Sequence, residues 1–157
     1  TRYPGTQGRR ALQDYFEKGL ELTGQAHRAG VGILVGTDSV IGGFRYHDEM
    51  GHLANAGISP AEVLRAAAID AARYAKLDSQ SGSIAIGKRA DLVLLAANPL
   101  EDIANTRRVT AVWLAGRLYD RRQLDALLAF TKDQANSPAN WVRLAWGFAR
   151  SGVSGEM

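Results

Sequence analysis

The sequence predicts an α/β protein, and three features of the chain support this fold class. A long amphipathic helical pattern leads into a glycine and then into a short apolar run, which ends abruptly in the polar sequence GTDS at residues 36–39. This order of helix, buried strand and polar loop is typical of proteins built on parallel sheets. Further along, short apolar runs between turn residues predict a small β unit, and helical periodicity then returns.

The composition is that of an ordinary globular protein and excludes several classes of function. The 157 residues are 46% hydrophobic and 22% charged, and no cysteine is present, which excludes disulfides and thiolate metal sites. The basic residues are scattered in pairs rather than clustered, so we expect no nucleic-acid partner. No apolar run approaches the roughly 20 residues of a membrane span. We therefore expect no membrane association and a cytoplasmic location, unless a signal lies upstream.

The first expected element is a helix over residues 7–28. Leu12, Phe16 and Leu20 recur there at helical spacing, with charged residues on the other side. Gly30 follows the last turn, where a glycine that ends the helix is expected. The apolar run VGILV at residues 31–35 then predicts a strand that is buried on both faces.

Two further helices are expected after this strand. A short helix over residues 46–55 follows a glycine-containing loop. Ser59, Pro60 and Glu62 then mark a clear helix start, because serine caps free backbone amides, proline fits the first helical position and glutamate completes a capping box. The alanine-rich helix that begins there is expected to continue to about Lys76, and its small side chains permit close packing.

The character of the sequence changes at Asp78. Residues 91–96 predict a second buried strand, and residues 110–115 and 117–119 predict a hairpin joined at Gly116. The tail is expected to be helical, with its last seven residues frayed. Its two apolar stripes consist of Leu124, Leu127 and Leu128, and of Trp141, Leu144, Ala145 and Phe148.

Two motifs are rejected on their spacing or context. Residues 82–88 (GSIAIGK) have the outline of a phosphate-binding loop, but Arg89 stands where serine or threonine is needed and the segment leads into a strand rather than a helix. A glycine-bounded turn is the favoured interpretation. His47 and His52 flank Glu49 as in a metalloprotease helix, but they are five residues apart, about 140° around a helix, so they diverge.

From the residues alone, two interpretations of Asp38 stand side by side. The residue directly follows the apolar run, and chemistry in parallel α/β proteins collects at the carboxyl ends of strands. An aspartate in this position is also suited to cap a following turn. The pattern alone does not choose between a catalytic residue and a turn cap.

Taken together, the segments resemble the amidohydrolase superfamily, in particular its branch of imidazolonepropionases and prolidase-like enzymes. The resemblance covers about residues 30–120. It rests on the strand ending in GTDS, the helix ISPAEVLRAAAIDAARYAKL, and the runs GSIAIGKRADLVLLAANPLEDI and RRVTAVWLAGRLYD. One departure is that relatives usually read ATINPA where this chain has AAIDAA at residues 67–72, and the missing proline should leave the helix straighter.

The resemblance implies a (β/α)₈ barrel with a small β-sandwich built from both ends of the chain. Residues 31–35 would be the eighth barrel strand. We expect the end of the barrel domain at 1–77, part of the composite β domain at 78–122 and a helical tail at 123–157. A complete barrel needs roughly 250 residues, and the chain opens on Thr1 rather than Met. We therefore expect a carboxyl-terminal portion of a longer protein.

The resemblance also implies a divalent metal, commonly zinc, with one or two ions in the complete enzyme. The family ligands are a His-x-His pair, often a modified lysine or a glutamate, two further histidines, and an aspartate after strand eight. Only the last has a counterpart here, and it is Asp38. As a metal ligand and catalytic residue, Asp38 would accept a proton from metal-activated water and pass it to the leaving nitrogen.

The same resemblance gives three weaker candidates for binding a small-molecule substrate. Phe44 and Arg45 fall in the loop expected at the mouth of the site, where Arg45 would hold a carboxylate in two-pronged fashion. A solvated loop arginine is nevertheless the favoured interpretation. His47 falls where relatives often carry histidine or a similar polar residue.

The sequence therefore predicts part of a metal-dependent hydrolase acting on carbon–nitrogen bonds in an amide, a cyclic amide or a dipeptide-like compound. It would need the amino-terminal remainder of the barrel, from the same gene or from another chain. The alternative is a catalytically silent association module, since an unpaired barrel strand seeks a partner. The sequence sets no oligomeric state and is compatible with a homo-oligomer.

Overall fold

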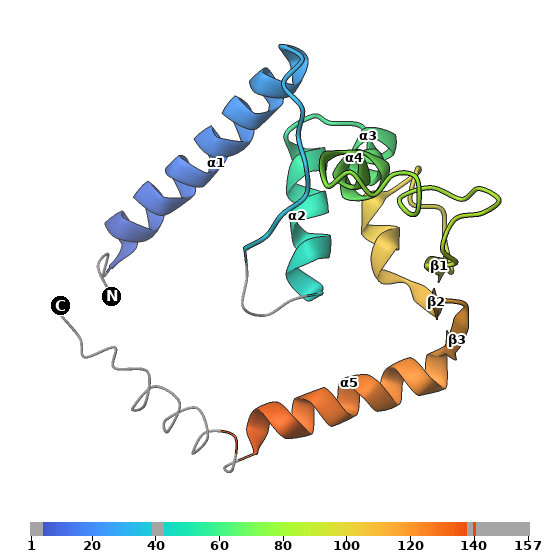
Figure 1. The fold of residues 1–157 in the computed structure, drawn as a ribbon. Coiled ribbons are helices and arrows are strands. Elements are labelled where there is room, and N and C mark those ends of the chain that lie inside the picture. The colour runs from blue at the N-terminus through green and yellow to red at the C-terminus, as the bar shows by residue number, and fades with distance from the viewer. Residues whose placement is uncertain (1–4, 39–42, 138–139, 141–157) are drawn as a thin grey trace, which may run out of the picture.

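The computed structural model describes residues 5–38, 43–137 and 140. Three helices, α2 (Phe44–Asn55), α3 (Pro60–Ala67) and α4 (Ile69–Tyr74), gather at its centre, and two longer helices, α1 (Thr6–Arg28) and α5 (Arg121–Asn136), extend away from them (Figure 1). A short 3₁₀ helix, η1 (Ile103–Arg107), and a three-stranded sheet connect the centre to α5. The α/β class is confirmed, with a small open antiparallel sheet among the described residues.

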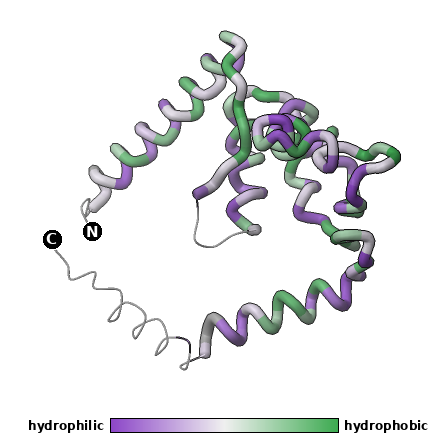
Figure 2. Tube along the Cα trace, in the orientation of Figure 1, coloured by the Kyte–Doolittle hydropathy of each residue, from purple (hydrophilic) through white to green (hydrophobic). Residues whose placement is uncertain are grey.

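The hydrophobic core is small and centres on α2. Its buried residues are Met50, Leu53, Ile58, Val63 and Ile103. Val63 is fully buried. Since a buried aliphatic side chain contributes about 1.5–3 kcal/mol, this cluster is the main source of tertiary stability in the centre. Much apolar surface stays outside it, including along α1 and α5, where apolar and polar residues are interleaved (Figure 2).

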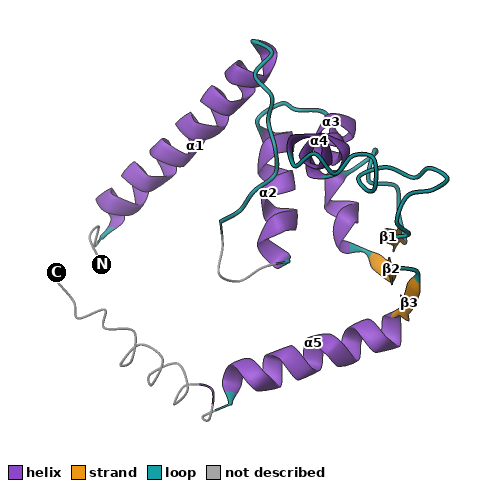
Figure 3. Cartoon of the chain, in the orientation of Figure 1, coloured by secondary structure: helices purple, strands orange, loops and turns teal. Residues whose placement is uncertain are grey.

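The segment between α1 and α2 corrects one prediction. Residues 31–38 are extended but form no strand, and Figure 3 draws them as loop. Ile33 and Val35 pack partly against the core, whereas Val31 is 54% exposed. The prediction of a strand buried on both faces is therefore wrong for the described chain. A parallel strand needs neighbours on both edges for its backbone groups, and the described residues place none there.

Helix α1 confirms the first predicted helix and packs on α2 near its own carboxyl end. The rings of Phe16 and His52 meet edge to face, with centroids 4.9 Å apart. Closer to the end of α1, Gly24 lies directly against the backbone of Ala56. The amino-terminal half of α1 is mostly exposed.

The helix expected to continue to Lys76 is instead broken into α3 and α4. Ser59, Pro60 and Glu62 form the predicted capping box at the start of α3. The break lies at Ala68, whose φ and ψ of −129° and −87° are not helical. No proline causes it, so the expectation of a straighter helix is wrong. At the break, the loop at Gly82 lies close to Ala68, Ile69 and Ala72, so the helix is interrupted where a distant loop packs on it.

The small β unit confirms the predicted strands. Strands β1 (Leu92–Leu95), β2 (Val109–Leu114) and β3 (Arg117–Asp120) are antiparallel in the order β1-β2-β3. The β2–β3 hairpin turns at Ala115 and Gly116, which have φ values of 51° and 81°, as a two-residue type I′ turn requires. The expected burial of the first strand is wrong, because Val93 and Leu94 are 59% and 52% exposed.

The tail begins with a second capping box, formed by Asp120 and Gln123 at the start of α5. The first predicted apolar stripe lies on this helix, and its residues Leu127 and Leu128 are half exposed. The second stripe and the last seven residues lie outside the described residues. In the part of the chain that the structure describes, no helix is long and apolar enough to span a bilayer.

Candidate active site

Asp38 ends the extended segment that joins α1 to α2. Asp38 is exposed, and its φ of 43° places its backbone in the left-handed region. This conformation is unfavourable for most side chains but is visited by aspartate. The chain therefore bends at Asp38, where the predicted loop at the mouth of the site begins.

A side chain from α2 holds the segment just before Asp38. The backbone N–H of Gly36 donates a hydrogen bond of 2.9 Å to Glu49 Oε1. Glu49 is followed in α2 by the buried core residue Met50, which is only 3% exposed. In the sequence, Glu49 stands out only as part of the rejected metalloprotease motif. No local sequence pattern predicts its contact with a backbone amide 13 residues earlier.

Tyr46, also on α2, ties this helix to the end of α3. Its hydroxyl donates a 2.9 Å hydrogen bond to the carbonyl oxygen of Ala67. Burial raises the pKa of Tyr46, and the nearby Glu49 carboxylate raises it further. Tyr46 is therefore a neutral donor that fixes α2 beside the break between α3 and α4.

The structure places Phe44 and Arg45 in the first turn of α2, both well exposed. Phe44 is 61% exposed. The Arg45 guanidinium lies 3.7 Å from Asp48, which also forms an ion pair with Arg107. The carboxylate next to Arg45 is thus one of the chain's own, which is compatible with the interpretation of Arg45 as a solvated arginine. Substrate binding by Phe44 and Arg45 stays a prediction.

His47 points away from this turn toward η1 (Ile103–Arg107). Its Nδ1 lies 3.0 Å from Thr106 Oγ1. Because the Thr106 hydroxyl donates its hydrogen to the carbonyl oxygen of Ile103 at 2.7 Å, its oxygen accepts a hydrogen bond from His47, which assigns the ring hydrogen to Nδ1. Burial lowers the pKa of His47, and Arg107 lowers it further against the opposite effect of Asp48. His47 is a neutral linker here, and its role toward substrate stays a prediction.

Three successive residues of α2 thus reach three different places. His47 binds Thr106, Asp48 pairs with Arg107, and Glu49 accepts from Gly36. The first two contacts join α2 to η1, and the third joins it to the segment that carries Asp38. The structure brings Asp38, Phe44, Arg45 and His47 onto two adjacent stretches of chain, with His47 turned toward η1.

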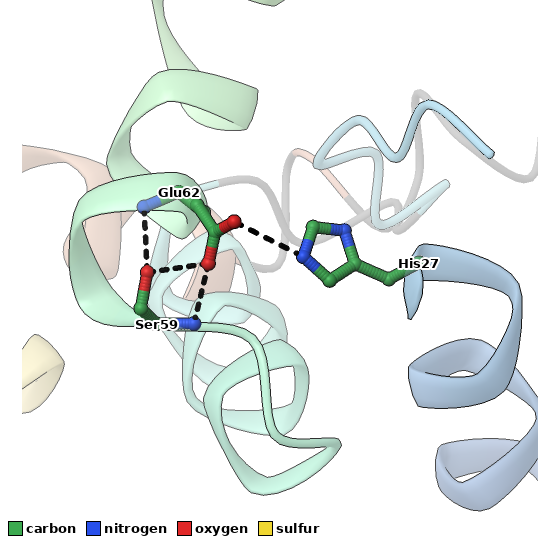
Figure 4. Close-up of polar contacts among 3 residues, drawn as sticks. All are labelled: His27, Ser59 and Glu62. Atoms are coloured by element: carbon green, nitrogen blue, oxygen red, sulfur yellow. Dashed lines mark hydrogen bonds and ion pairs between the residues drawn. The ribbon is translucent and has the colours of Figure 1, made fainter. Parts of the chain in front are cut away.

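A second polar cluster lies at the other end of the extended segment. His27 Nε2 lies 3.3 Å from Glu62 Oε1, while Ser59 binds the same carboxylate through its hydroxyl and its backbone N–H (Figure 4). Ser59 holds the pKa of Glu62 below its usual value, with a smaller contribution from His27. The capping box was predicted, but its link to α1 through His27 was not.

This cluster borders a hollow of about 500 Å³. Residues 30–34, Glu62, Arg65 and Arg73 are among those that line it, whereas Asp38 is not. The hollow thus lies along the flank of the extended segment, and Asp38 does not contribute to its lining.

The described residues alone do not make up a metal centre. Within residues 5–38, 43–137 and 140, no three side chains of histidine, cysteine, aspartate or glutamate lie close enough to share an ion. Asp38 offers one carboxylate at most.

The structure also explains why residues 82–88 are no phosphate-binding loop. Lys88 Nζ donates to the carbonyl oxygen of Asp78 and to Ser83 Oγ at 2.6 Å, so its hydrogen bonds stay within its own loop.

Comparison with known proteins places this geometry in a family. The model of the amidohydrolase family matches residues 9–119, which include most of α1, the extended segment, α2 to α4 and nearly all of the β unit. The chain belongs to the amidohydrolase family. The resemblance that the sequence predicted is thereby confirmed, and Asp38 lies within the matched region.

Similar proteins include hydrolases of several kinds. An ochratoxinase from Aspergillus niger is 32% identical over 112 residues, which cover 69% of this chain and 23% of the ochratoxinase. A Xaa-Pro dipeptidase solved with methionine in its active site matches with a TM-score of 0.61 at 28% identity, covering 64% of this chain and 25% of that one.

A putative prolidase from Bifidobacterium longum matches with a TM-score of 0.58 at 38% identity, covering 68% of this chain and 29% of the prolidase. This amidohydrolase-family chain thus spans about a quarter of the length of these relatives. Its solved neighbours therefore include prolidase-like proteins, the branch of the family that the sequence indicated.

Proposed function

We propose that this chain is the carboxyl-terminal part of a metal-dependent hydrolase that cleaves carbon–nitrogen bonds in amides, cyclic amides or dipeptide-like substrates. The observation that carries the proposal is the position of Asp38, at the end of an extended segment inside the region that matches the amidohydrolase family. The similar Xaa-Pro dipeptidase supports a dipeptide-like substrate class. Under this proposal, residues 31–35 form the eighth strand of a (β/α)₈ barrel once their neighbours are present.

Asp38 is proposed as both a metal ligand and the group that moves a proton. An exposed carboxylate is a suitable ligand for a divalent cation such as zinc, and such an ion lowers the pKa of bound water toward about 7. The carboxylate would accept a proton during attack on the substrate carbonyl and return it to the leaving nitrogen. The remaining ligands would come from outside the described residues, because these hold no complete set.

The exposed flank of residues 31–35 supports the need for further chain. Val31 is 54% exposed, and this stretch forms no sheet among the described residues. Extended backbone with unpaired edges favours pairing with another strand. We propose that the partner is the amino-terminal remainder of the barrel, with the barrel end at 1–77, the composite β domain at 78–122 and the tail at 123–157.

The test is Asp38→Asn in the complete protein, assayed with Xaa-Pro dipeptides and N-acyl amino acids in the presence of zinc or manganese. Because general acid–base catalysis contributes about 10²–10⁴-fold, we expect turnover to fall by at least about 100-fold. Asp14→Asn, which alters an aspartate on the exposed part of α1, is the matched control and should keep full activity. Retained turnover in Asp38→Asn would exclude the proposed role.

The alternative is that the chain serves only to associate with another chain. Intact mass and metal analysis of the purified material separate the two. A longer or co-purifying chain with near-stoichiometric metal supports the hydrolase. A lone chain of 16.9 kDa without metal supports the silent module and limits catalysis to its parent protein.

A further inference from the structure

The contact between Glu49 and Gly36 has a consequence for Asp38. Among hydrogen bonds that join described residues, two hold the extended segment of residues 31–38. Val31 N donates to the carbonyl oxygen of Ala26 at 3.0 Å, and Gly36 N donates to Glu49 Oε1 at 2.9 Å. The first fixes the start of the segment at the end of α1. The second lies two residues before Asp38.

Glu49 is well suited to fix a backbone amide. Its carboxylate makes the bond charge-assisted, and hydrogen bonds to charged groups contribute about 1.5–3 kcal/mol, more than neutral ones. Both neighbours of Glu49 in α2 are anchored, since Met50 lies in the core and Asp48 forms an ion pair with Arg107. Glu49 therefore presents its acceptor from a rigid base.

Asp38 needs such support because its own backbone is strained. Its φ of 43° lies in the left-handed region, which costs a residue with a side chain roughly 1–2 kcal/mol. Gly36 has no side chain to pack, and a Cβ atom there would meet nothing within 4 Å. Packing at residue 36 therefore adds little, so α2 holds this residue through its backbone amide, next to the apolar contact that Val35 makes with the core.

We propose that Glu49 is a positioning residue: by binding the backbone N–H of Gly36, its carboxylate fixes the direction in which Asp38 presents its own carboxylate. The inference rests on the proposed role of Asp38. Glu49 itself touches neither substrate nor metal in this arrangement. A misplacement of about 1 Å in a reacting group can cost about 100-fold in rate, so loss of the bond should be visible in turnover.

The kinetic test compares Glu49→Ala and Glu49→Gln in the complete protein. Glu49→Ala removes the acceptor, and we expect kcat to fall by about 10–100-fold with KM changed by less than about twofold. Glu49→Gln keeps an amide oxygen that accepts from Gly36, so it should recover most of the activity. Glu101→Ala removes an exposed carboxylate that binds only Asn98 among the described residues, and it should match wild type.

A second test does not depend on activity and also uses the complete protein. In wild type, the Gly36 amide should be protected from hydrogen exchange, and ¹⁵N relaxation of residues 36–38 should resemble that of α2. Glu49→Ala should abolish the protection and loosen these residues, while the circular dichroism spectrum keeps its helical signal. Glu49→Gln and Glu101→Ala should behave as wild type.

These tests separate failure of the inference from failure of the proposed function. If Glu49→Ala leaves kcat and Gly36 exchange unchanged, or if Glu49→Gln is as damaged as Glu49→Ala, the positioning role is wrong even when Asp38→Asn is inactive. If Glu49→Ala frees residues 36–38 but Asp38→Asn retains full turnover, the contact is real and the proposed function of Asp38 is wrong.

Discussion

A Cβ atom on Gly24 would lie 2.1 Å from the carbonyl oxygen of Ala56, so the backbone of α1 packs directly on the residue that ends α2. No side chain fits between them. Together with the edge-to-face contact of Phe16 and His52, this close approach sets how α1 meets the central helices. Since the extended segment follows α1 directly, the same contact sets where that segment starts.

Gly24→Ala should separate α1 from α2. The added methyl group would clash with backbone rather than with a flexible side chain, and overpacking of this kind costs about 1–3 kcal/mol. Urea unfolding measures the loss. Gly19→Ala is the matched control on the same helix, because a Cβ atom there meets nothing within 4 Å. It should stabilise the chain by about 0.5–1 kcal/mol through helix propensity, and an equal effect of both changes would contradict the close packing.

Gly82→Ala should be among the most harmful loop substitutions. Its φ of +81° already disfavours a side chain, and a Cβ atom would lie 2.6 Å from that of Ala72. Gly87→Ala has a similar φ of +87° but open space around it, so it should show only the backbone cost of about 1–2 kcal/mol. Thermal unfolding of the two variants isolates the packing of the loop on the break at Ala68. A smaller loss of thermal stability in Gly82→Ala than in Gly87→Ala would contradict this packing of the loop.

Ser59→Ala should weaken α3 in a pH-dependent way. Loss of the cap costs about 1 kcal/mol at neutral pH. Ser59 also lowers the pKa of Glu62 from its usual 4.5. A carboxylate with a lowered pKa stabilises the fold at pH values above its usual pKa, and this stabilisation is lost as the pH falls. The difference in unfolding free energy between variant and wild type should therefore shrink below pH 4.5. Urea unfolding at neutral pH and below pH 4.5 tests this. The control is Ser79→Ala, which changes an exposed loop serine.

His47→Asn should remove part of the destabilisation of the chain in mild acid. Burial lowers the pKa of His47 from 6.5, with Arg107 adding to the effect. The unfolded chain therefore binds the proton more readily than the folded chain, and stability falls as the pH drops below 6.5. Asparagine keeps a donor for Thr106 without the titration. The change in unfolding free energy across this pH should be smaller in His47→Asn than in His52→Asn, which retains His47.

Local chemistry predicted the elements whose causes are local. The start of α3 follows from Ser59, Pro60 and Glu62, and the hairpin follows from turn residues around Gly116. The break at Ala68 has no such local signal, and the residue that lies close to it, Gly82, comes from a separate loop. The apolar pattern of residues 31–35 is that of a barrel strand, but a strand also needs neighbours, which the described chain does not provide.

In the candidate site, too, only the features that depend on contiguous sequence were predicted. Asp38 was identified from its place after an apolar run and from the family resemblance, and both depend on contiguous sequence. The partner of His47 is Thr106 and that of Asp48 is Arg107, each 59 residues away. No spacing rule within a helix reports such pairs, because they depend on how η1 docks on α2.

The three successive contacts of α2 also restrict how its sequence can vary in length. One residue inserted between Gly43 and Phe44 would leave the contacts of Tyr46, His47 and Glu49 intact and would lengthen only the approach from Asp38. One residue inserted between His47 and Glu49 would turn the later part of the helix by about 100° relative to the earlier part. The bond of His47 to Thr106 and that of Glu49 to Gly36 could then no longer form together. Single-residue insertions are therefore expected to be tolerated at the start of this helix and to be rejected between His47 and Glu49.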